Sequence, residues 1–561
     1  MNIFFNFTLV HIMKTIVNCN SKNQVDLLVY NAQVYTVDET FSMEEAFAVK
    51  DGRFVAIGKT EYICSAYSSD IEVDMKGKPI YPGFHDAHCH FVCASMKPHW
   101  IDLGNAASYK EVIDFVAKHY EANPSFECIV GYGWNDKKWQ EQGSISNLEL
   151  NSKFPHIPVV IRRTCEHTLI ANEEAIRQLK EKFAGIVFPT EEAPIDENGN
   201  FTGIFKEKTA ERFWEIIPKP TKEDILKAAT LCYQCGITSI SDPGLLFGFS
   251  SSYIDFLDNL QQEKEERLSL RIDAWLKASE ENFERFKKPY RTDRLTVGCV
   301  KLIMDGGLGA QSAWMLKPYE KEAENETDNY GIRNISNKDF LNHCQKAYKA
   351  GLQVATHCIG DAANREALDI YGRLLGSEND RRWRIEHAQI IAPEDFENFR
   401  KYSIVPSVQP THATSDCPWA YKLIGVDRLR GAYAFLELKN QLGWLPFGTD
   451  HPVEPLNPIH TFIAAVFRKN LIFLPDGNCL MEPDDGFQME NAVSREDALR
   501  AMTIWAAKAS FDEDKKGSIE IGKLADFVVL DTDIMVVSEK DIPKAKVKYT
   551  YISGECVYER K

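Results

Sequence analysis

The sequence lacks a run of the roughly 20 apolar residues that a membrane-spanning helix needs. It also lacks an excess of basic residues, because 65 Lys and Arg stand against 82 Asp and Glu and the formal net charge is −17. Nucleic acids and anionic membranes bind basic surfaces, so neither is expected as a partner. The 14 cysteines are scattered, mostly singly, in apolar runs. That pattern favours reduced thiols and a cytoplasmic location over a disulfide framework.

The first 22 residues are the ambiguous part of the chain. They begin "MNIFFNFTLVHIMKTIVNCN", an apolar stretch with no basic residue before it. Asn18 before Cys19 is a poor cleavage or lipidation site, where a small residue would be expected. We expect residues 1–22 to form a disordered extension. Its first 12 residues lie upstream of an alternative start at Met13. A degenerate export or lipoprotein signal is the competing interpretation.

Both ends of the remaining chain read as β-structure. Near the N-terminus, "DLLVYNAQVYTVD" is followed by "FAVKDGRFVAIG", two short strands around the turn pair Asp51-Gly52. Near the C-terminus, "DFVVLDTD" precedes "VKYTYISGECVYER", which turns at Ser553-Gly554. A lone hairpin is only marginally stable, which disfavours two separate terminal hairpins. The sequence therefore predicts one composite β-sandwich built from residues 23–81 and 515–561.

Between these ends, residues 82–514 alternate short apolar runs with helical patterns. Eight runs read as buried strands: "KPIYPGFHDAHCH", "GITSISDPG", "LSLRIDAWL", "VGCVKLIMDG", "LQVATHCIGD", "RWRIEHAQ", "YSIVPSVQP" and "LGWLPFGTDHP". The stretch "AANREALDIYGRLLG" has helical spacing and a closing glycine. This α/β pattern predicts a (β/α)₈ barrel. The long gap after the first strand predicts an insertion at about 91–235, whose aromatics either line a pocket or form its core (Tyr132, Trp134 and Trp139).

Histidines and an aspartate lie where the predicted strands end. His88 and His90 are two residues apart, so on a strand they face the same side, whereas His85 has the opposite parity. One His-x-His is common by chance. However, polar residues recur at or near four other strand ends, which is where barrel active sites gather: Lys301, His357, His387 and Asp450.

Each of these residues has an ordinary alternative explanation. His357 could be a core histidine, His387 or Asp450 a helix cap, and Lys301 a snorkelling cation. Their joint occurrence favours a metal site. Imidazole and carboxylate suit Zn²⁺, and also Mn²⁺, Fe²⁺ or Co²⁺. Lys301 could ligate only after carbamylation by CO₂, which would let it bridge two ions. A bound ion lowers the pKa of water and generates hydroxide, with Asp450 as general base.

Six motifs, taken in order, resemble those of a known family: "PGFHDAHCH", "VKLIMDGGLGA", "THCIGDAAN", "RIEHAQ", "GTDHPV" and "GSIEIGKLADFVVLD". They are similar to the amidohydrolase superfamily, in its amidohydrolase family 3 branch, which includes N-substituted formamide deformylase. The resemblance runs from about Asp26 to Val557. It implies a metal-dependent hydrolase with a (β/α)₈ barrel and a sandwich built from both ends.

The resemblance also implies a role for each site residue. Its metal ligands fall on His88, His90, Lys301 as a carbamate, His357, His387 and Asp450, which is also the general base. Glu386 and Gln389 flank the ligands, and Asp305 and Gln311 lie in the "DGGLGAQ" motif near the substrate. An arginine is usual in the family at Gln311 and at Ala362. Their replacement weakens the case for a strongly anionic substrate.

The predicted activity is hydrolysis of a C–N bond in a small amide, formamide or N-acyl compound. His167 and His412 could hydrogen-bond the developing oxyanion, or be ordinary histidines. His167 lies in a "CEHT" stretch that departs from the family pattern. Two alternatives stay open: the same site acting on an ester, lactone or phosphoester, and a non-catalytic binding descendant of the fold. One or two ions, and a homodimer, are both compatible with the sequence.

Overall fold

The computed structural model describes residues 22–561, apart from residues 125, 137–138, 140–144, 164–167, 245–251, 322–326 and 475–478. The predicted N-terminal extension therefore lies, except for Lys22, outside the described residues. None of the described helices is long and apolar enough to cross a membrane. The 12 cysteines of the described part of the chain are all free thiols.

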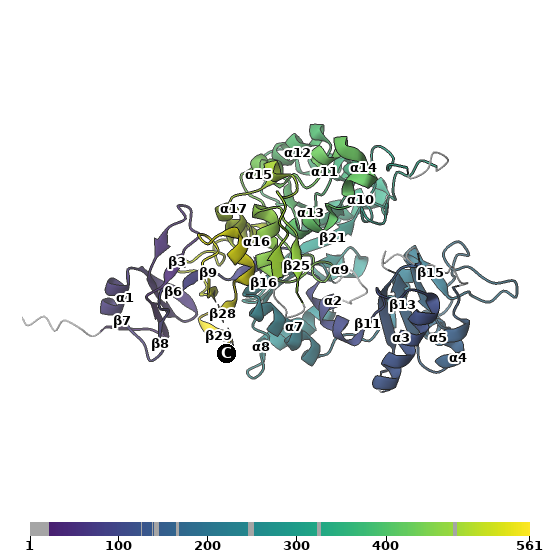
Figure 1. The fold of residues 1–561 in the computed structure, drawn as a ribbon, viewed down its shortest axis with the longest axis horizontal. Helices are drawn as coiled ribbons and strands as arrows, with labels where there is room; N and C mark the ends of the chain where they lie inside the picture. The colour runs from purple at the N-terminus through teal and green to yellow at the C-terminus, as the bar shows by residue number, and fades with distance from the viewer. Residues whose placement is uncertain are drawn as a thin grey trace, which may run out of the picture.

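Strands from the two ends of the chain share one six-stranded sheet, where purple and yellow ribbons meet in Figure 1. Its order is β29 (Glu555–Glu559), β28 (Val547–Ile552), β27 (Phe527–Leu530), β9 (Pro79–Pro82), β3 (Gln33–Tyr35) and β4 (Met43–Glu44). A four-stranded sheet accompanies it: β6 (Arg53–Gly58), β5 (Ala46–Lys50), β2 (Leu27–Tyr30) and β8 (Glu72–Asp74). Phe47, Phe54 and Phe527 are buried in one cluster between them. Both hairpins expected at Asp51-Gly52 and Ser553-Gly554 are present.

Small elements complete this terminal region. Helix α1 (Thr60–Ala66) contacts β5 and β6, and the short strands β1 (Asn23–Gln24) and β7 (Tyr67–Ser68) pair in parallel. Tyr35 and Tyr81 stack at 5.1 Å and both donate hydroxyl hydrogen bonds to the Asp533 carboxylate. Asp533 lies in the C-terminal segment, so these bonds join the two ends of the chain.

The centre of the molecule contains two sheets of parallel strands. The first is β10 (Phe84–Asp86), β16 (Ile237–Asp242), β17 (Arg271–Ala274) and β20 (Leu295–Val297), with an antiparallel edge strand β19 (Tyr290–Arg291). The second is β18 (Leu276–Lys277), β21 (Cys299–Ile303), β22 (Gln353–Cys358), β23 (Arg384–His387) and β24 (Val405–Ser407). These strands are almost entirely buried, as parallel strands covered on both faces are.

Two of the predicted strands differ in the structure. "KPIYPGFHDAHCH" is divided, because β9 joins the terminal sheet and only β10 joins the central strands. "LGWLPFGTDHP" forms no extended strand and is held by single contacts. Val408 forms a parallel bridge with Phe447, and the Ala87 amide donates to the Phe447 carbonyl at 3.0 Å. Residues 446–450 thus connect β24 to β10.

Helices surround the central strands (Figure 1). Those within or beside this region are α2 (Phe91–Met96), α7 (Lys222–Gln234), α8 (Ser252–Gln262), α9 (Glu280–Arg285), α10 (Asn337–Lys349), α11 (Asp361–Leu375), α12 (Phe396–Lys401), α13 (Pro410–Asp416), α14 (Ala420–Arg428), α15 (Phe435–Leu442), α16 (Pro458–Val466), α17 (Arg495–Ala501) and α18 (Ile504–Ala509). The hairpin of β25 (Leu471–Phe473) and β26 (Cys479–Met481) follows α16. The predicted helix between β22 and β23 is α11, and it ends at Gly376 with φ +69°.

The segment between α2 and α7 forms its own sheet, which lies beside the central strands at the right of Figure 1. The sheet consists of β11 (Ile101–Asp102), β12 (Ile129–Trp134), β13 (Val159–Arg163), β14 (Thr168–Ala171) and β15 (Ile204–Lys206). Helices α3 (Tyr109–Ala122), α4 (Leu148–Lys153), α5 (Glu173–Lys182) and α6 (Glu207–Arg212) accompany it. Trp134 and Trp139 are buried in its separate core, so these two aromatics are core residues. Tyr132 instead lies under the Lys97 amine, 4.5 Å away.

Candidate metal centre

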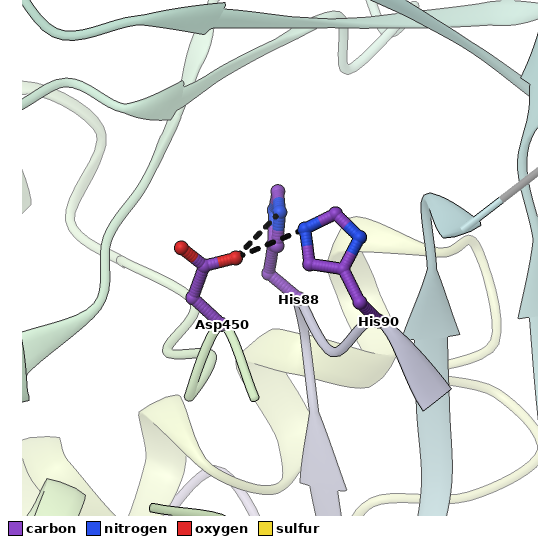
Figure 2. A group of neighbouring side chains, drawn as sticks. All are labelled: His88, His90 and Asp450. Carbon is purple, nitrogen blue, oxygen red and sulfur yellow. Dashed lines mark ion pairs between the residues drawn. The ribbon is translucent and has the colours of Figure 1, made fainter. Parts of the chain in front are cut away.

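His88 and His90 converge on Asp450, although they do not lie on a strand as expected. β10 ends at Asp86, and His90 is the N-cap residue of α2. The Asp450 amide donates to the His88 carbonyl at 2.7 Å, so the backbone brings these residues together. Asp450 Oδ1 lies 3.4 Å from His88 Nε2 and 3.1 Å from His90 Nε2 (Figure 2). The three side chains place ligand atoms within 4.8 Å of one another.

A second group of ligand atoms shares the same aspartate. His387, the last residue of β23, and His412 of α13 lie with Asp450 in another cluster within 4.8 Å. His357, from β22, has its ring centre 4.5 Å from that of His387. His387 and Asp450 have φ values of +71° and +60°. Left-handed backbone at non-glycine residues is costly and tends to be retained at functional sites.

Lys301 lies on β21 in register with the ligand-bearing strands. Its neighbour two residues on, Ile303, pairs with His357 across the sheet. The Lys301 side chain is buried, and its amine lies 5.8 Å from the centre of the Trp275 ring. Burial lowers the pKa of this amine, against the attraction of Glu386 and Asp450. A lowered pKa increases the share of neutral amine, which is the form that reacts with CO₂.

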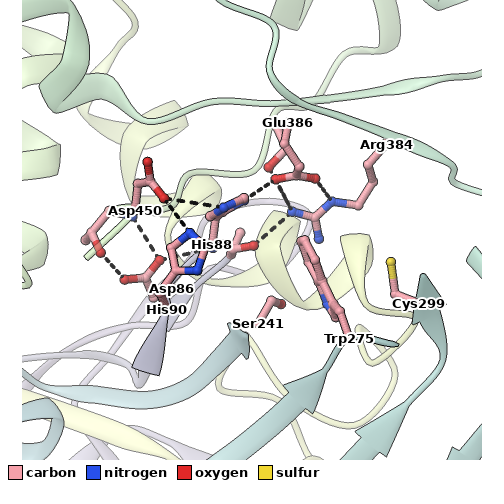
Figure 3. Close-up of polar contacts among 12 residues, drawn as sticks. Asp86, His88, His90, Ser241, Trp275, Cys299, Arg384, Glu386 and Asp450 are labelled. Atoms are coloured by element: carbon pink, nitrogen blue, oxygen red, sulfur yellow. Dashed lines mark hydrogen bonds and ion pairs between the residues drawn. The ribbon is translucent and has the colours of Figure 1, made fainter. Parts of the chain in front are cut away.

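A buried network fixes the orientation of His88 (Figure 3). His88 Nδ1 donates to Glu386 Oε2 at 2.6 Å. Arg384 donates to both oxygens of Glu386, at 2.7 and 3.1 Å, and to the Ala87 carbonyl at 2.8 Å. Its guanidinium also stacks over Trp275 at 4.7 Å. Because Nδ1 is held by the carboxylate, His88 presents Nε2 toward Asp450, the arrangement usual for a metal-binding histidine.

A second buried carboxylate braces the Asp450 backbone. Asp86 accepts hydrogen bonds from the Thr449 amide at 2.9 Å and the Thr449 hydroxyl at 2.6 Å. It also accepts from the His88 amide at 3.1 Å. Asp86 therefore ties the segment after β10 to residues 446–450, although the two are far apart in the sequence.

The electrostatics favour neutral imidazoles around an ionised carboxylate. Burial lowers the pKa of His88 to about 4 and that of His357 to about 3, and it holds the pKa of His387 well below its usual value. Burial opposes ionisation of Asp450, but hydrogen bonds from His412 and His90 hold its pKa well below the usual range. Neutral imidazole and carboxylate are the protonation states in which these groups bind metals.

The donor set fits a divalent cation. Within the described residues, His88 Nε2, His387 Nδ1 and Asp450 Oδ1 are buried and make no well-formed hydrogen bond, although Asp450 Oδ1 lies within ion-pair distance of His88 Nε2 and His90 Nε2. Leaving buried polar atoms unpaired costs about 1–3 kcal/mol each. Such atoms on His88, His387 and Asp450, which come from separate segments and belong to the two ligand clusters, are explained if a cation binds there. Imidazole nitrogen and carboxylate oxygen are ligands for zinc and its first-row neighbours.

His412 differs from the other histidines. Its Nε2 donates to Asp450 Oδ2 at 3.2 Å and its Nδ1 donates to Glu454 Oε1 at 3.4 Å. Burial opposes its charge, but these two carboxylates raise the pKa of His412 to about 10. The structure thus places His412 as a charged partner of Asp450.

The remaining four predicted site residues have different outcomes. Asp305 accepts hydrogen bonds from the amides of Trp314, Ile359 and Gly360, and so joins the ends of β21 and β22. The Gln389 amide donates to Asp416 and Tyr433, beside His412. Gln311 lies in a turn at φ +51° whose carbonyl accepts from Asn329, and the structure does not place it in either ligand cluster. His167 lies outside the described residues.

Arg384, Asp86 and Asp242 contribute to the site but were not predicted from the sequence. Asp242, the last residue of β16, accepts from the Val92 amide at 3.0 Å, just after His90. A signal was present for two of them, because Arg384 interrupts the apolar strand before "EH" and Asp86 lies inside "HDAH". Charged residues in buried strands need partners, and that requirement indicates a buried network.

Parallel strands with a histidine and aspartate cluster at their C-terminal ends define a mixed α/β protein with a candidate cation site. The chain belongs to the Amidohydrolase family, whose sequence profile matches residues 72–558. It is thus a member of a metal-dependent amidohydrolase family.

Similar proteins cover almost the whole chain. Protein LONG AFTER FAR-RED 3 of Arabidopsis thaliana is 31% identical over 559 residues, covering 95% of this chain and 91% of that protein. N-substituted formamide deformylase of Arthrobacter pascens is 24% identical over 573 residues, covering 95% and 98%. A crystal structure described as an uncharacterized metal-dependent hydrolase from Pyrococcus horikoshii has a TM-score of 0.73 and 27% identity, covering 91% and 99%.

Proposed function

We propose that this protein hydrolyses a C–N bond of a small-molecule amide, formamide or N-acyl compound with the help of a divalent metal. The observation that carries the proposal is the cluster of buried, unpaired ligand atoms around Asp450. The likeness to N-substituted formamide deformylase supports an amide-type bond. It does not fix the substrate, because the two chains are only 24% identical.

We infer that the central strands close into a (β/α)₈ barrel. β17 and β18 are separated by a single residue, as are β20 and β21, so each pair continues one strand from the first sheet into the second. The bridge from Val408 to Phe447 and the bond from Ala87 to Phe447 support closure between β24 and β10 through residues 446–450. Barrel strands carry active sites at their C-terminal ends, where these ligands lie.

In this proposal a bound divalent ion, with zinc the first candidate, polarises the substrate carbonyl and lowers the pKa of a water molecule. His88, His90, His357, His387 and Asp450 would hold it. Lys301, as a carbamate formed when its neutral amine attacks CO₂ and loses a proton, would complete a site for two ions.

Asp450 serves as the general base. Its second oxygen is held by His412, so the carboxylate stays ionised and oriented while it accepts a proton from water and passes it to the departing amine. His412 therefore acts on Asp450 rather than on the substrate. A hydrogen bond to the oxyanion would need the Nε2 proton of His412, which is donated to Asp450 in this structure, so we assign His412 the role of positioning Asp450. The role predicted for His167 stays a prediction.

The test is a hydrolysis panel of matched amides, formamides and esters with zinc-loaded protein. Asp450→Asn keeps the size of the side chain and removes the base. Turnover of an amide that falls by about 10²-fold or more in the variant supports the proposal. Turnover only of esters, lactones or phosphoesters would move the activity to that class. A fully metallated protein that turns over no member of the panel would indicate a non-catalytic descendant of the fold.

A further inference from the structure

Gln409 is a buried glutamine whose polar atoms have no partner. It lies two residues after the end of β24, it is 2% exposed, and both its amide oxygen and its amide nitrogen lack a hydrogen bond among the described residues. Other buried glutamines are bonded. Gln353 donates to the carbonyls of Arg382 and Ala509, and Gln389 donates to Asp416 and Tyr433. Gln409 is therefore an exception that needs an explanation.

The strand register places Gln409 on the same face of the strands as Glu386. Ser407 of β24 pairs with Glu386 across the sheet and accepts a hydrogen bond from Arg384, so it faces the ligand side of the strands. The chain remains extended to Gln409, which has φ −116° and ψ 97°. Residues two apart on an extended chain face the same side. Gln409 thus lies on the face of Ser407 and Glu386, one step nearer the ends of the strands where the ligands gather.

The next helix links Gln409 to the catalytic groups. Gln409 is the N-cap residue of α13, yet its side chain caps no amide of that helix. One turn later, His412 contacts Asp450 and remains partly exposed, at 13% of its side chain. The Gln409 amide is enclosed in this structure. For a substrate to reach this amide, the Gln409 side chain would have to turn toward the partly exposed His412.

The unpaired Gln409 amide destabilises the folded protein and makes no hydrogen bond that compensates for this among the described residues. Each buried polar atom left without a partner costs free energy, whereas an apolar side chain of the same length would not. Charged and polar groups that are unfavourable for stability are retained where they serve function. A primary amide offers an acceptor and donors side by side, so its best complement is an N–H next to a carbonyl, as in the paired bonds of glutamine with adenine.

We propose that Gln409 binds the substrate through an amide or urea group whose N–H and C=O lie on the same side of the C–N bond. Such groups occur in primary carboxamides, ureas and cyclic amides. This inference rests on the proposed function, since it names the substrate class of the same site. It assigns Gln409 a binding role, with no proton transfer.

Binding of unreactive probes tests this directly. Imidazolidin-2-one, a cyclic urea, and cyclopentanone, which has the same ring size without N–H groups, are compared by saturation-transfer NMR on zinc-loaded protein. We expect the wild type to prefer the urea, and Gln409→Met to lose that preference by about tenfold, as two neutral hydrogen bonds imply. Gln409→Glu, which accepts but does not donate hydrogen bonds when it is ionised, provides a second variant of similar shape. Equal preference in wild type and variants would overturn the proposal.

A stability measurement separates binding from a structural role. Gln353→Met is the matched control, because Gln353 is also a buried glutamine but its amide nitrogen donates hydrogen bonds. It is the first residue of β22, at the end of the strands opposite to Gln409. We expect Gln353→Met to lower the melting temperature and leave the urea preference intact, and Gln409→Met to leave the melting temperature equal or higher. A drop for Gln409→Met as large as that of the control would contradict the argument. Because neither readout needs turnover, they can succeed where the hydrolysis panel fails, and the reverse.

Discussion

Arg384 offers the sharpest test of the network behind the metal centre. Its side chain is fully buried and donates to both oxygens of Glu386, to the Ala87 carbonyl and to Ser407. Arg384→Met removes the cation and leaves the Glu386 carboxylate buried with His88 as its remaining partner. Breaking one side of a buried ion pair costs about 3–5 kcal/mol. We expect that loss in the unfolding free energy of the metal-free protein, measured by urea denaturation.

The double variant Arg384→Met with Glu386→Met distinguishes charge burial from packing. With neither charge present, most of the stability should return, because apolar replacements of buried ion pairs are often neutral or stabilising. Metal affinity should nevertheless fall by about 10–100-fold, since His88 Nδ1 loses the group that orients it. A double variant as unstable as Arg384→Met would refute the charge argument. Unchanged metal affinity would refute the positioning role of Glu386.

Three further predictions concern other parts of the molecule. Trp139→Ala, in the separate core of the inserted sheet, should cost about 3–5 kcal/mol in local unfolding followed by hydrogen exchange, without changing metal content. Asp526 is paired with Arg271 at 2.6 Å, and although burial opposes its ionisation this guanidinium lowers its pKa. The stability that this ion pair contributes to the fold should be complete above about pH 4 and should be lost as pH falls through the pKa of Asp526 in the folded state. Asp526→Asn should flatten that part of the pH–stability curve. Asp86→Ala should weaken zinc binding in a chelator competition, because Asp86 no longer holds Thr449; an unchanged affinity would contradict this.

Local signals explain what could be predicted from the sequence. The hairpin at Asp51-Gly52 and the helix ending at Gly376 depend on nearby residues, and both appear as expected. The family was recognised from the order of its motifs, and the sequence profile confirms it. Strand-end histidines were found because parallel strands place their C-terminal ends at one edge.

Long-range contacts explain what was missed. His88 and His90 were expected on a strand, but β10 stops at Asp86, where contacts to Thr449 replace the sheet ladder. Arg384 stands out as a charge in a buried strand, but nothing near it in the sequence identifies its partner, and Gln409 has no local signal. The role of each depends on what the fold places beside it: Arg384 binds Glu386, whereas the Gln409 side chain has no hydrogen-bond partner among the described residues. The domain boundaries, cytoplasmic location and homodimer stay predictions.

The most direct test of the central claim is metal content per chain, measured by elemental analysis in the presence of bicarbonate. It compares the wild type with Lys301→Ala and with the ligand variant His387→Asn. The account predicts close to two ions in the wild type, one or none in Lys301→Ala, and a loss in His387→Asn. One ion in the wild type, unchanged in Lys301→Ala, would remove the carbamate and leave a single-ion site. No stable metal in the wild type would contradict the metal centre itself.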